Sequence, residues 1–273
     1  KNFRKLKIVL GGAHPTLNPE EALNLSGADI VVRGEGEITF REVVEKLPLK
    51  KIKGISYRIN GDIIHNPDRE LLDDLDSLPK PDYSLIEFEK YFGQDVYLHM
   101  ESPSAIIFSS RGCPYNCIFC TTSKVWRRRF RTHSVDYIID WIKILVEKYG
   151  VREIEFHDDQ FLANIARVNE LCNKIIKERI NIKWWVPSGL SVWLLNEDLI
   201  RVMYKTGMYR ATLPIESGSA NTIRFIRKNI KLEKVIENVK FLKRIGVFTT
   251  GIFIIGFPEE KIGDIESTHD FAF

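Results

Sequence analysis

The stretch that decides the fold is SAIIFSSRGCPYNCIFC, residues 104–120. It begins as an apolar run typical of a buried strand and ends in a loop that carries Cys113, Cys117 and Cys120. Thiolates ligate zinc ions and iron–sulfur clusters, and the C-x3-C-x2-C spacing lets one loop wrap a single compact centre. A tetrahedral site needs four ligands, so three cysteines leave one place to be filled.

The fourth cysteine of the chain does not fill that place. Cys172 lies in a predicted helix, on the same face as the valine and isoleucines of residues 165–176, and we interpret it as a buried core residue. A cluster held by the other three cysteines then keeps one iron open for an exogenous molecule. The alternative is a zinc knuckle with His133 or His157 as the fourth ligand.

The chain around the cysteine loop predicts a barrel. From residue 104 onward, five apolar strands alternate with amphipathic helices, among them those at 135–149 and 232–245. This alternation indicates parallel strands in a full or partial (β/α) barrel. Chemistry in such barrels lies at the C-terminal ends of the strands. Each unusual stretch follows one strand: the cysteine loop, HDDQF (157–161), PSG (187–189), ESGS (216–219) and GFPEE (256–260).

The upstream part of the chain predicts a second α/β unit and a connector. Apolar strands at 6–10 and 28–32 each end in a Gly-rich turn and precede a short helix, which indicates parallel sheet. The sequence ISYRINGDIIH alternates around Asn60-Gly61 and predicts a β-hairpin. We expect three regions: an α/β unit at 1–48, a linker with the hairpin at 49–101, and the barrel at 102–273.

Composition places few limits on function. The chain has 273 residues, 44% of them hydrophobic and 28% charged, and a net charge of +3, which argues neither for nucleic acid nor for an anionic membrane. It has no apolar run of transmembrane length, and the apolar run in KNFRKLKIVLGG is too short for a signal peptide. Clustered cysteines indicate metal or redox use in a reducing compartment, so we expect a cytoplasmic protein. Both ends resemble cut ends, and we expect a fragment of a longer protein.

The cysteine loop carries a family resemblance. CPYNCIFC resembles the C-x3-C-x-aromatic-C motif of the radical S-adenosylmethionine (SAM) superfamily, with Phe119 at the aromatic position. The resemblance implies that Cys113, Cys117 and Cys120 hold a [4Fe-4S] cluster. The amino and carboxylate groups of SAM occupy the open iron, and one electron cleaves SAM to a 5′-deoxyadenosyl radical that abstracts hydrogen. It also implies a low-potential electron donor, a flavodoxin or ferredoxin.

Two downstream motifs resemble the same family. Asp158 and Asp159 stand where the family places an acidic or polar pair near the SAM amino group, although Gly-Gly-Glu is the commoner form. IESGS resembles the fourth-strand motif, which implies that Glu216 and Ser219 bind the ribose hydroxyls or the methionine carboxylate of SAM. Helix capping is the alternative for all four residues.

The fifth strand resembles the adenine-binding motif of the family. GIFIIGFPEE implies adenine contact through Ile255, Gly256 and Phe257, with the glycine permitting close approach. The usual form is GFPGE, and this chain lacks the second glycine. The run RRRFR (127–131) could neutralise an anionic substrate or the methionine carboxylate, and its alternative is a solvated loop.

The upstream unit resembles the closing part of a cobalamin-binding domain. GGAHPTLNPEEAL followed by GADIVVRGEGEITFREVVE carries this resemblance, and it implies that Gly11 and Gly12 lie beside the nucleotide tail of cobalamin. The usual lower-ligand signature, D-x-H-x-x-G, is absent from the chain. We interpret His14 as a surface loop residue and expect cobalamin binding to need a segment upstream of residue 1.

The resemblance implies a cobalamin-dependent radical SAM enzyme that acts on a small organic molecule. Our first hypothesis is methylation at carbon, and oxidative cyclisation, as in the anaerobic magnesium-protoporphyrin ester cyclases, stands beside it. The alternatives are a methylthiotransferase-like radical SAM enzyme without cobalamin, and a non-catalytic iron–sulfur electron carrier or zinc module. No residue is identified as a proton-transfer group, and no nucleic-acid partner or transmembrane segment is expected.

Overall fold

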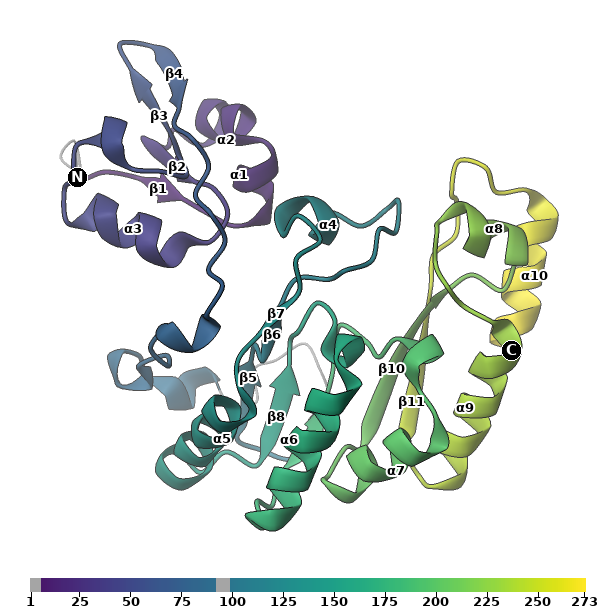
Figure 1. The fold of residues 1–273 in the computed structure, drawn as a ribbon. Coiled ribbons are helices and arrows are strands. Elements are labelled where there is room, and N and C mark those ends of the chain that lie inside the picture. The colour runs from purple at the N-terminus through teal and green to yellow at the C-terminus, as the bar shows by residue number, and fades with distance from the viewer. Residues whose placement is uncertain (1–5, 92–98) are drawn as a thin grey trace. The chain divides into compact units, whose positions relative to one another are not determined.

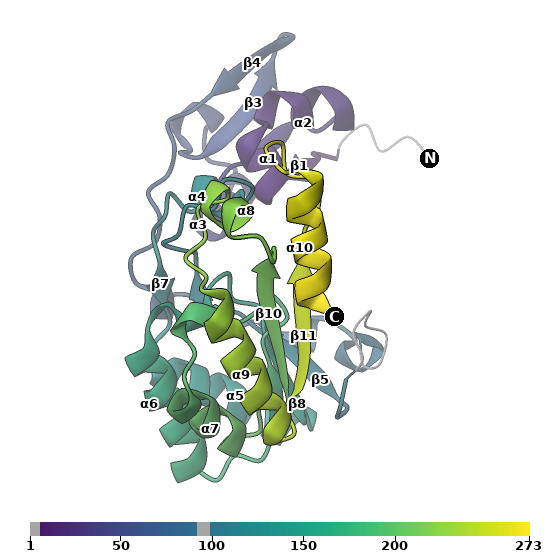
Figure 2. The same ribbon diagram turned by 90° about the vertical axis from the view of Figure 1, so that its right-hand side faces the viewer.

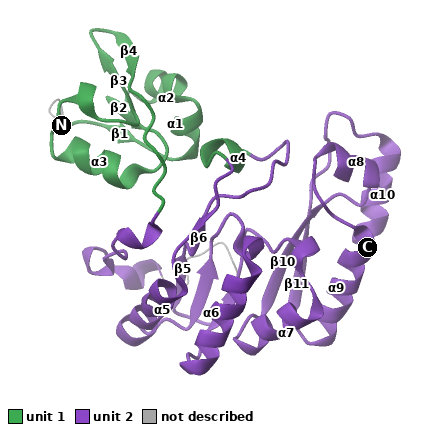
Figure 3. Cartoon of the chain, in the orientation of Figure 1, with its two compact units in different colours: residues 1–73, 121–127 green, residues 74–120, 128–273 purple. Residues whose placement is uncertain are grey.

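The chain forms two compact units in the computed structural model, which describes residues 6–91 and 99–273 (Figures 1 and 3). Unit 1 comprises residues 1–73 and 121–127, and unit 2 comprises residues 74–120 and 128–273. No helix in the described residues is long and apolar enough to cross a membrane.

Unit 1 is built on a four-stranded sheet with the order β1-β2-β3-β4. Strands β1 and β2 are parallel, and β3 and β4 are antiparallel to their neighbours. The strands are β1 (Val9–Leu10), β2 (Ile30–Val32), β3 (Ile55–Ile59) and β4 (Asp62–His65). The helices are α1 (Ala13–Leu17), α2 (Pro19–Ser26), α3 (Gly36–Val44) and α4 (Thr122–Val125).

The predicted hairpin is confirmed, and it belongs to the sheet of unit 1. Asn60 and Gly61 both have positive φ, 50° and 98°, as a two-residue type I′ turn requires. We expected the hairpin within a linker at 49–101. Strand β3 pairs instead with β2, because its buried Ile55 and Tyr57 share an apolar cluster with Ile30. The compact unit therefore extends to residue 73.

Unit 2 contains five consecutive strand–helix pairs in its described part, as the alternation predicted. Strands β5, β8 and β9 form one parallel sheet, and β10 and β11 pair in parallel and lie side by side in both views (Figures 1 and 2). A parallel bridge between Trp184 and Met208 links the two sheets. The strands are β5 (Ser104–Ile107), β8 (Glu153–Phe156), β9 (Lys183–Trp185), β10 (Arg210–Glu216) and β11 (Phe248–Phe253).

Helices follow these strands in the expected order. They are α5 (Val135–Tyr149), α6 (Ile165–Lys177), α7 (Glu197–Lys205), α8 (Ala220–Phe225), α9 (Leu232–Arg244) and α10 (Ile262–Ala272). The short strands β6 (Ser110–Arg111) and β7 (Arg131–Thr132) pair in antiparallel fashion within the first strand–helix connection. Single 3-10 turns lie at η1 (Leu49–Lys51), η2 (Leu75–Ser77), η3 (Tyr83–Leu85), η4 (Phe88–Tyr91), η5 (Phe161–Ala163) and η6 (Val192–Leu194).

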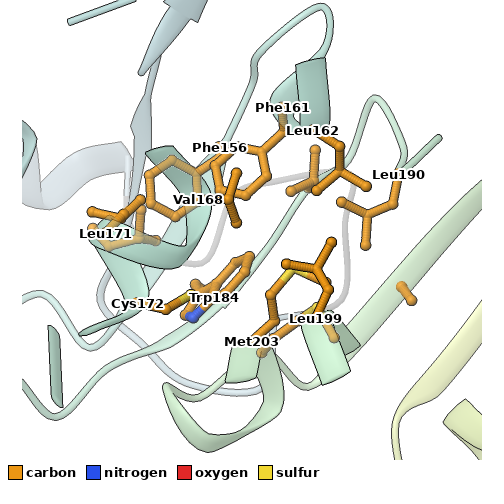
Figure 4. Packing of buried hydrophobic residues seen from close by; sticks show 14 of the residues in the cluster. Phe156, Phe161, Leu162, Val168, Leu171, Cys172, Trp184, Leu190, Leu199 and Met203 are labelled. Carbon is orange, nitrogen blue, oxygen red and sulfur yellow. The ribbon is translucent and has the colours of Figure 1, made fainter. Parts of the chain in front are cut away.

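The core of unit 2 lies between the strands and the helices. Alternate residues of β8, Ile154 and Phe156, belong to this core, whereas Glu153 and Glu155 point to the opposite, inner face of the strand. Cys172 is buried in the same core beside Trp184, as we predicted (Figure 4). The Thr206 hydroxyl donates to its sulfur at 3.7 Å, so the Cys172 thiol is engaged within the core and does not join the other cysteines.

Candidate functional site

The cysteine loop is held from several sides within unit 2. Its three cysteines form no disulfide in the described structure and are of intermediate exposure. The backbone N–H of Cys120 donates to the Cys117 carbonyl at 3.1 Å, so these two residues share one turn. Nearby, the Trp193 indole N–H donates to the Tyr115 hydroxyl at 3.2 Å, and the two rings meet edge to face. These contacts fix the loop without using a thiol.

The chemistry of this donor set fits an iron–sulfur cluster. Burial, together with the smaller effects of the neighbouring Cys120, Cys117 and Asp159, raises the pKa of the Cys113 thiol to about 11. The three thiols thus lie close enough to repel one another when ionised, a repulsion that bound cations remove. Among the described residues, no three His, Cys, Asp or Glu side chains meet as ligands of one ion. A four-iron cluster takes each thiolate on a different iron, so its ligands need not converge on one point.

Asp158 and Asp159 follow β8, and their carboxylates accept hydrogen bonds from different residues. Asp158 is completely buried and accepts hydrogen bonds from the Ser109 N–H at 2.7 Å, the Ser109 hydroxyl at 2.6 Å and the Ser110 hydroxyl. Burial raises the pKa of Asp158, and the hydrogen bonds from the two serines oppose that rise. Asp159 accepts from the Gly112 N–H at 3.0 Å, directly before Cys113. Both carboxylates therefore attach the second strand to the start of the cysteine loop.

Glu216 ends β10 in an unusual state. Its backbone has φ of 71°, a left-handed conformation that a glutamate adopts only at a cost. One carboxylate oxygen, Oε1, accepts from the buried Lys228 ammonium, and the other, Oε2, is buried without a hydrogen-bond partner among the described residues. A buried carboxylate oxygen that lacks a partner is rare, and it fits a site that receives hydroxyl donors from a ligand.

Ser219 is already engaged in the protein. Its hydroxyl accepts from the N–H groups of Asn221 and Thr222 at the start of α8, and it donates to Asp264 at 2.5 Å. This arrangement is the N-cap that we weighed as its alternative. Lys228 is the residue that sequence reasoning missed at this corner. Only the fold reveals it, because a single lysine twelve positions after Glu216 has no distinguishing pattern in one sequence.

The residues after β11 form an apolar edge near the cysteine loop. The rings of Phe119 and Phe257 lie 5.6 Å apart, so the aromatic position of the loop contacts the fifth-strand motif. Ile255 is 60% exposed, and Gly256 has φ of 97°, a region that favours glycine. The Gly256 N–H donates to Glu260 at 2.6 Å. The structure thus places Phe119 beside the predicted adenine-binding segment.

The inner face of β8 carries a histidine–carboxylate pair that sequence reasoning also missed. Nε2 of His157 lies 2.9 Å from Oε2 of the buried Glu155. The Tyr209 hydroxyl donates to Glu153 at 2.7 Å, one layer along the same face. Strict alternation in REIEFH could have signalled this polar face, since the strand's even and odd positions differ in polarity.

In unit 1, Gly11 and Gly12 lie between β1 and α1, and both are exposed. Gly12 has φ of 109°, and an added Cβ there meets no atom within 4 Å. The Thr16 hydroxyl donates to the Gly12 carbonyl at 2.7 Å and accepts from the Gly34 N–H at 2.9 Å, which ties the two strand ends together. His14, expected in a loop, lies in α1, exposed and 3.8 Å from Glu21.

Comparison with known proteins identifies the family to which the chain belongs. Residues 107–272 match the family model of the radical SAM superfamily. An uncharacterized methyltransferase of Pyrococcus horikoshii, PH0819, is 38% identical over 270 residues, which cover 97% of this chain and 57% of that protein. The chain belongs to the radical SAM superfamily. Residues 1–44 match the model of the B12 binding domain, in agreement with the resemblance of the upstream unit.

Other radical SAM relatives carry two kinds of name. A cytidylyl-2-hydroxyethylphosphonate methyltransferase of Streptomyces wedmorensis is 29% identical over 97% of this chain and 56% of its own length. An anaerobic magnesium-protoporphyrin IX monomethyl ester cyclase of Rubrivivax gelatinosus is 28% identical over 97% of this chain and 48% of its own. The chain spans about half the length of these curated relatives.

Solved structures show the same radical SAM fold. The cobalamin-dependent SAM radical enzyme OxsB with aqua-cobalamin bound aligns with a TM-score of 0.78 at 22% identity, over 97% of this chain and 38% of that one. The radical SAM methyltransferase TsrM of Kitasatospora setae aligns with a TM-score of 0.76 at 15% identity, over 97% and 53% of the two chains. The predicted fold, a partial barrel preceded by a cobalamin-domain remnant, is confirmed.

Proposed function

We propose that this chain belongs to a cobalamin-dependent radical SAM enzyme that methylates carbon in a small organic molecule. The observation that carries the proposal is the convergence of three thiols at the C-terminal ends of the strands with a buried carboxylate oxygen of Glu216 that has no partner among the described residues. Methyltransferases among the relatives support methylation, and the cyclase relatives support oxidative ring closure as the second candidate.

Each residue of the site has a role in this proposal. Cys113, Cys117 and Cys120 hold the [4Fe-4S] cluster, which supplies the electron that splits SAM. Asp159 holds the loop through the Gly112 N–H. Glu216 receives the ribose hydroxyls of SAM on its free oxygen, with Lys228 balancing its charge.

The remaining predicted residues contact adenine, leave room for cobalamin or support the site from within the protein. Ile255, Gly256 and Phe119 offer an apolar edge to adenine. The exposed Gly11 and Gly12 leave room for the cobalamin nucleotide tail in the complete domain. Asp158 and Ser219 support these groups from within the protein, because their polar atoms are already hydrogen-bonded.

The reductant and the compartment are part of the same proposal. A flavodoxin or ferredoxin supplies the low-potential electron. The protein works in the cytoplasm, a reducing compartment, which the clustering of three cysteines at one metal centre favours.

The test is reductive cleavage of SAM by the full-length protein, reconstituted anaerobically with iron and sulfide and reduced with dithionite. We expect 5′-deoxyadenosine to form in the wild type and not in Cys117→Ala. A cluster that takes up electrons but yields no 5′-deoxyadenosine would indicate the electron-carrier alternative. Cleavage that is indifferent to cobalamin, in a protein that binds no corrinoid, would favour the methylthiotransferase-like alternative.

A further inference from the structure

A small basic pocket lies within unit 1. It has a volume of about 160 Å³ and lies at the C-terminal ends of β1 and β2. Four segments line it: α1, the turn after β2, the segment after β4, and α4 with Arg127 just beyond its end. Open α/β sheets bind ligands at this end of their strands. Its charged lining residues are Arg33, Asp68, Arg69, Lys124 and Arg127.

The side chains that line this pocket carry more positive than negative charge. Asp68 is shared between two guanidinium groups, 3.2 Å from Nη1 of Arg33 and 2.9 Å from Nη2 of Arg127. Arg69 is balanced by a separate ion pair with Glu42. Within the described ranges, the side-chain ammonium of Lys124 has neither an ion pair nor a hydrogen bond, and only its backbone N–H is bonded, to the Thr121 carbonyl at 2.9 Å. One carboxylate therefore faces three cations, which leaves two positive charges to attract an anion.

A buried donor on Arg33 also indicates that a ligand binds in this pocket. Its side chain is only 15% exposed, and its Nη2 is satisfied by the carbonyl of Asn66. The Nε–H is nevertheless buried without a hydrogen-bond acceptor in the described structure. Buried donors of this kind are rare in native proteins, and an acceptor supplied by a ligand accounts for this one.

Size and charge together define the ligand. Pockets that enclose a whole cofactor or drug-sized molecule have volumes of roughly 300–1,000 Å³. A cavity of about 160 Å³ accommodates only one small group of a larger molecule. Guanidinium and ammonium groups bind phosphate oxygens through strong charge-assisted hydrogen bonds.

We propose that this basic pocket of unit 1 binds a phosphate group carried by a larger ligand. Two sources share this chemistry: the phosphodiester in the nucleotide tail of cobalamin, and a phosphate on another small molecule. The first source rests on the proposed function, and the second does not. Lys124 is the residue whose substitution tests the proposal, because its ammonium group has no partner among the described residues.

The test compares two corrinoids by isothermal titration of the full-length protein. Hydroxocobalamin carries the nucleotide tail and its phosphodiester, and cobinamide lacks both. We expect Lys124→Gln to weaken hydroxocobalamin binding about tenfold, as loss of one charge-assisted hydrogen bond does, and to leave cobinamide binding unchanged. Lys51→Gln, an exposed lysine of unit 1 outside the pocket, should change neither affinity.

A third titration, with inorganic phosphate, separates the two sources. If Lys124→Gln leaves both corrinoid affinities unchanged but abolishes saturable phosphate binding, the pocket serves a different phosphorylated molecule. If the variant changes neither corrinoid nor phosphate binding, the proposal is overturned. A wild type that binds phosphate but no corrinoid would overturn only the cobalamin part of the proposed function.

Discussion

At the residue scale, two adjacent aspartates show how one short motif can serve both folding and chemistry. Asp158 has its whole carboxylate hydrogen-bonded inside the protein, whereas Asp159 reaches the backbone in front of Cys113. The sequence HDDQF predicted polar side chains at the C-terminal end of β8. It could not distinguish the two aspartates, because the difference depends on Ser109 and Ser110, nearly fifty residues earlier in the chain.

Substitution of Asp158 tests its structural role. Asp158→Asn removes a buried charge near Arg167 and puts an amide N–H where only acceptors fit. Breaking a buried charged network costs roughly 3 kcal/mol, so we expect a loss of unfolding free energy near that size in urea denaturation. Asp140→Asn, at an exposed position of α5, is the control. Equal stability of the two variants would disprove the structural role.

The proposed role of Glu216 leads to a prediction about the affinity of the protein for SAM. With the wild-type carboxylate, Oε2 is free to accept a ribose hydroxyl; Glu216→Gln removes the charge that strengthens this bond. We expect the dissociation constant for SAM to rise about tenfold in equilibrium dialysis of the folded protein. The exposed Glu259→Gln should bind as the wild type does. Unchanged SAM affinity in Glu216→Gln would remove this residue from the proposed site.

At the element scale, local signals predicted most helices, strands and turns. Gly27 and Gly150 end helices α2 and α5 in left-handed conformations, and Asn60-Gly61 forms its hairpin turn. These outcomes depend on backbone preferences of single residues. The pairing of β3 with β2 was missed, because it depends on apolar residues that meet only after the chain has folded. Helix α4, only four residues long, has no periodicity to detect.

Two glycines that follow helices provide a matched test at this scale. Gly207 follows α7 with φ of 101°, and Gly246 follows α9 with φ of 80°. A Cβ at Gly207 would lie 2.0 Å from the Ile182 carbonyl oxygen, whereas one at Gly246 meets nothing within 4 Å. We expect Gly246→Ala to cost about 1–2 kcal/mol of left-handed strain and Gly207→Ala at least twice that. Similar denaturation midpoints for both variants would contradict the close packing of this turn against β9.

At the scale of the whole molecule, the chain has separate apolar cores in its two units. Ile55 is buried in a cluster of unit 1, and Ile142 is buried in the large cluster of unit 2. The sequence predicted two such regions from their two strand–helix patterns. It did not predict that residues 121–127, which follow Cys120 directly, belong to unit 1. That assignment arises from long-range contacts, such as the ion pair between Arg127 and Asp68.

Separate cores predict separable unfolding. Ile55→Ala and Ile142→Ala each remove a fully buried side chain, at a cost of about 2–5 kcal/mol. We expect each variant to increase hydrogen exchange mainly in its own unit, as measured by mass spectrometry across the full-length protein. If either substitution increased exchange equally throughout both units, the two units would instead form one cooperative body.

The central claim is that three cysteines hold a cluster whose fourth iron receives SAM. Electron paramagnetic resonance of the anaerobically reconstituted, dithionite-reduced protein, with and without SAM, tests it most directly. We predict a four-iron signal that shifts when SAM is added, disappears in Cys117→Ala and persists in Cys172→Ala, whose thiol lies in the core. A four-iron signal that SAM leaves unmoved, or bound zinc with no iron signal, would contradict the account.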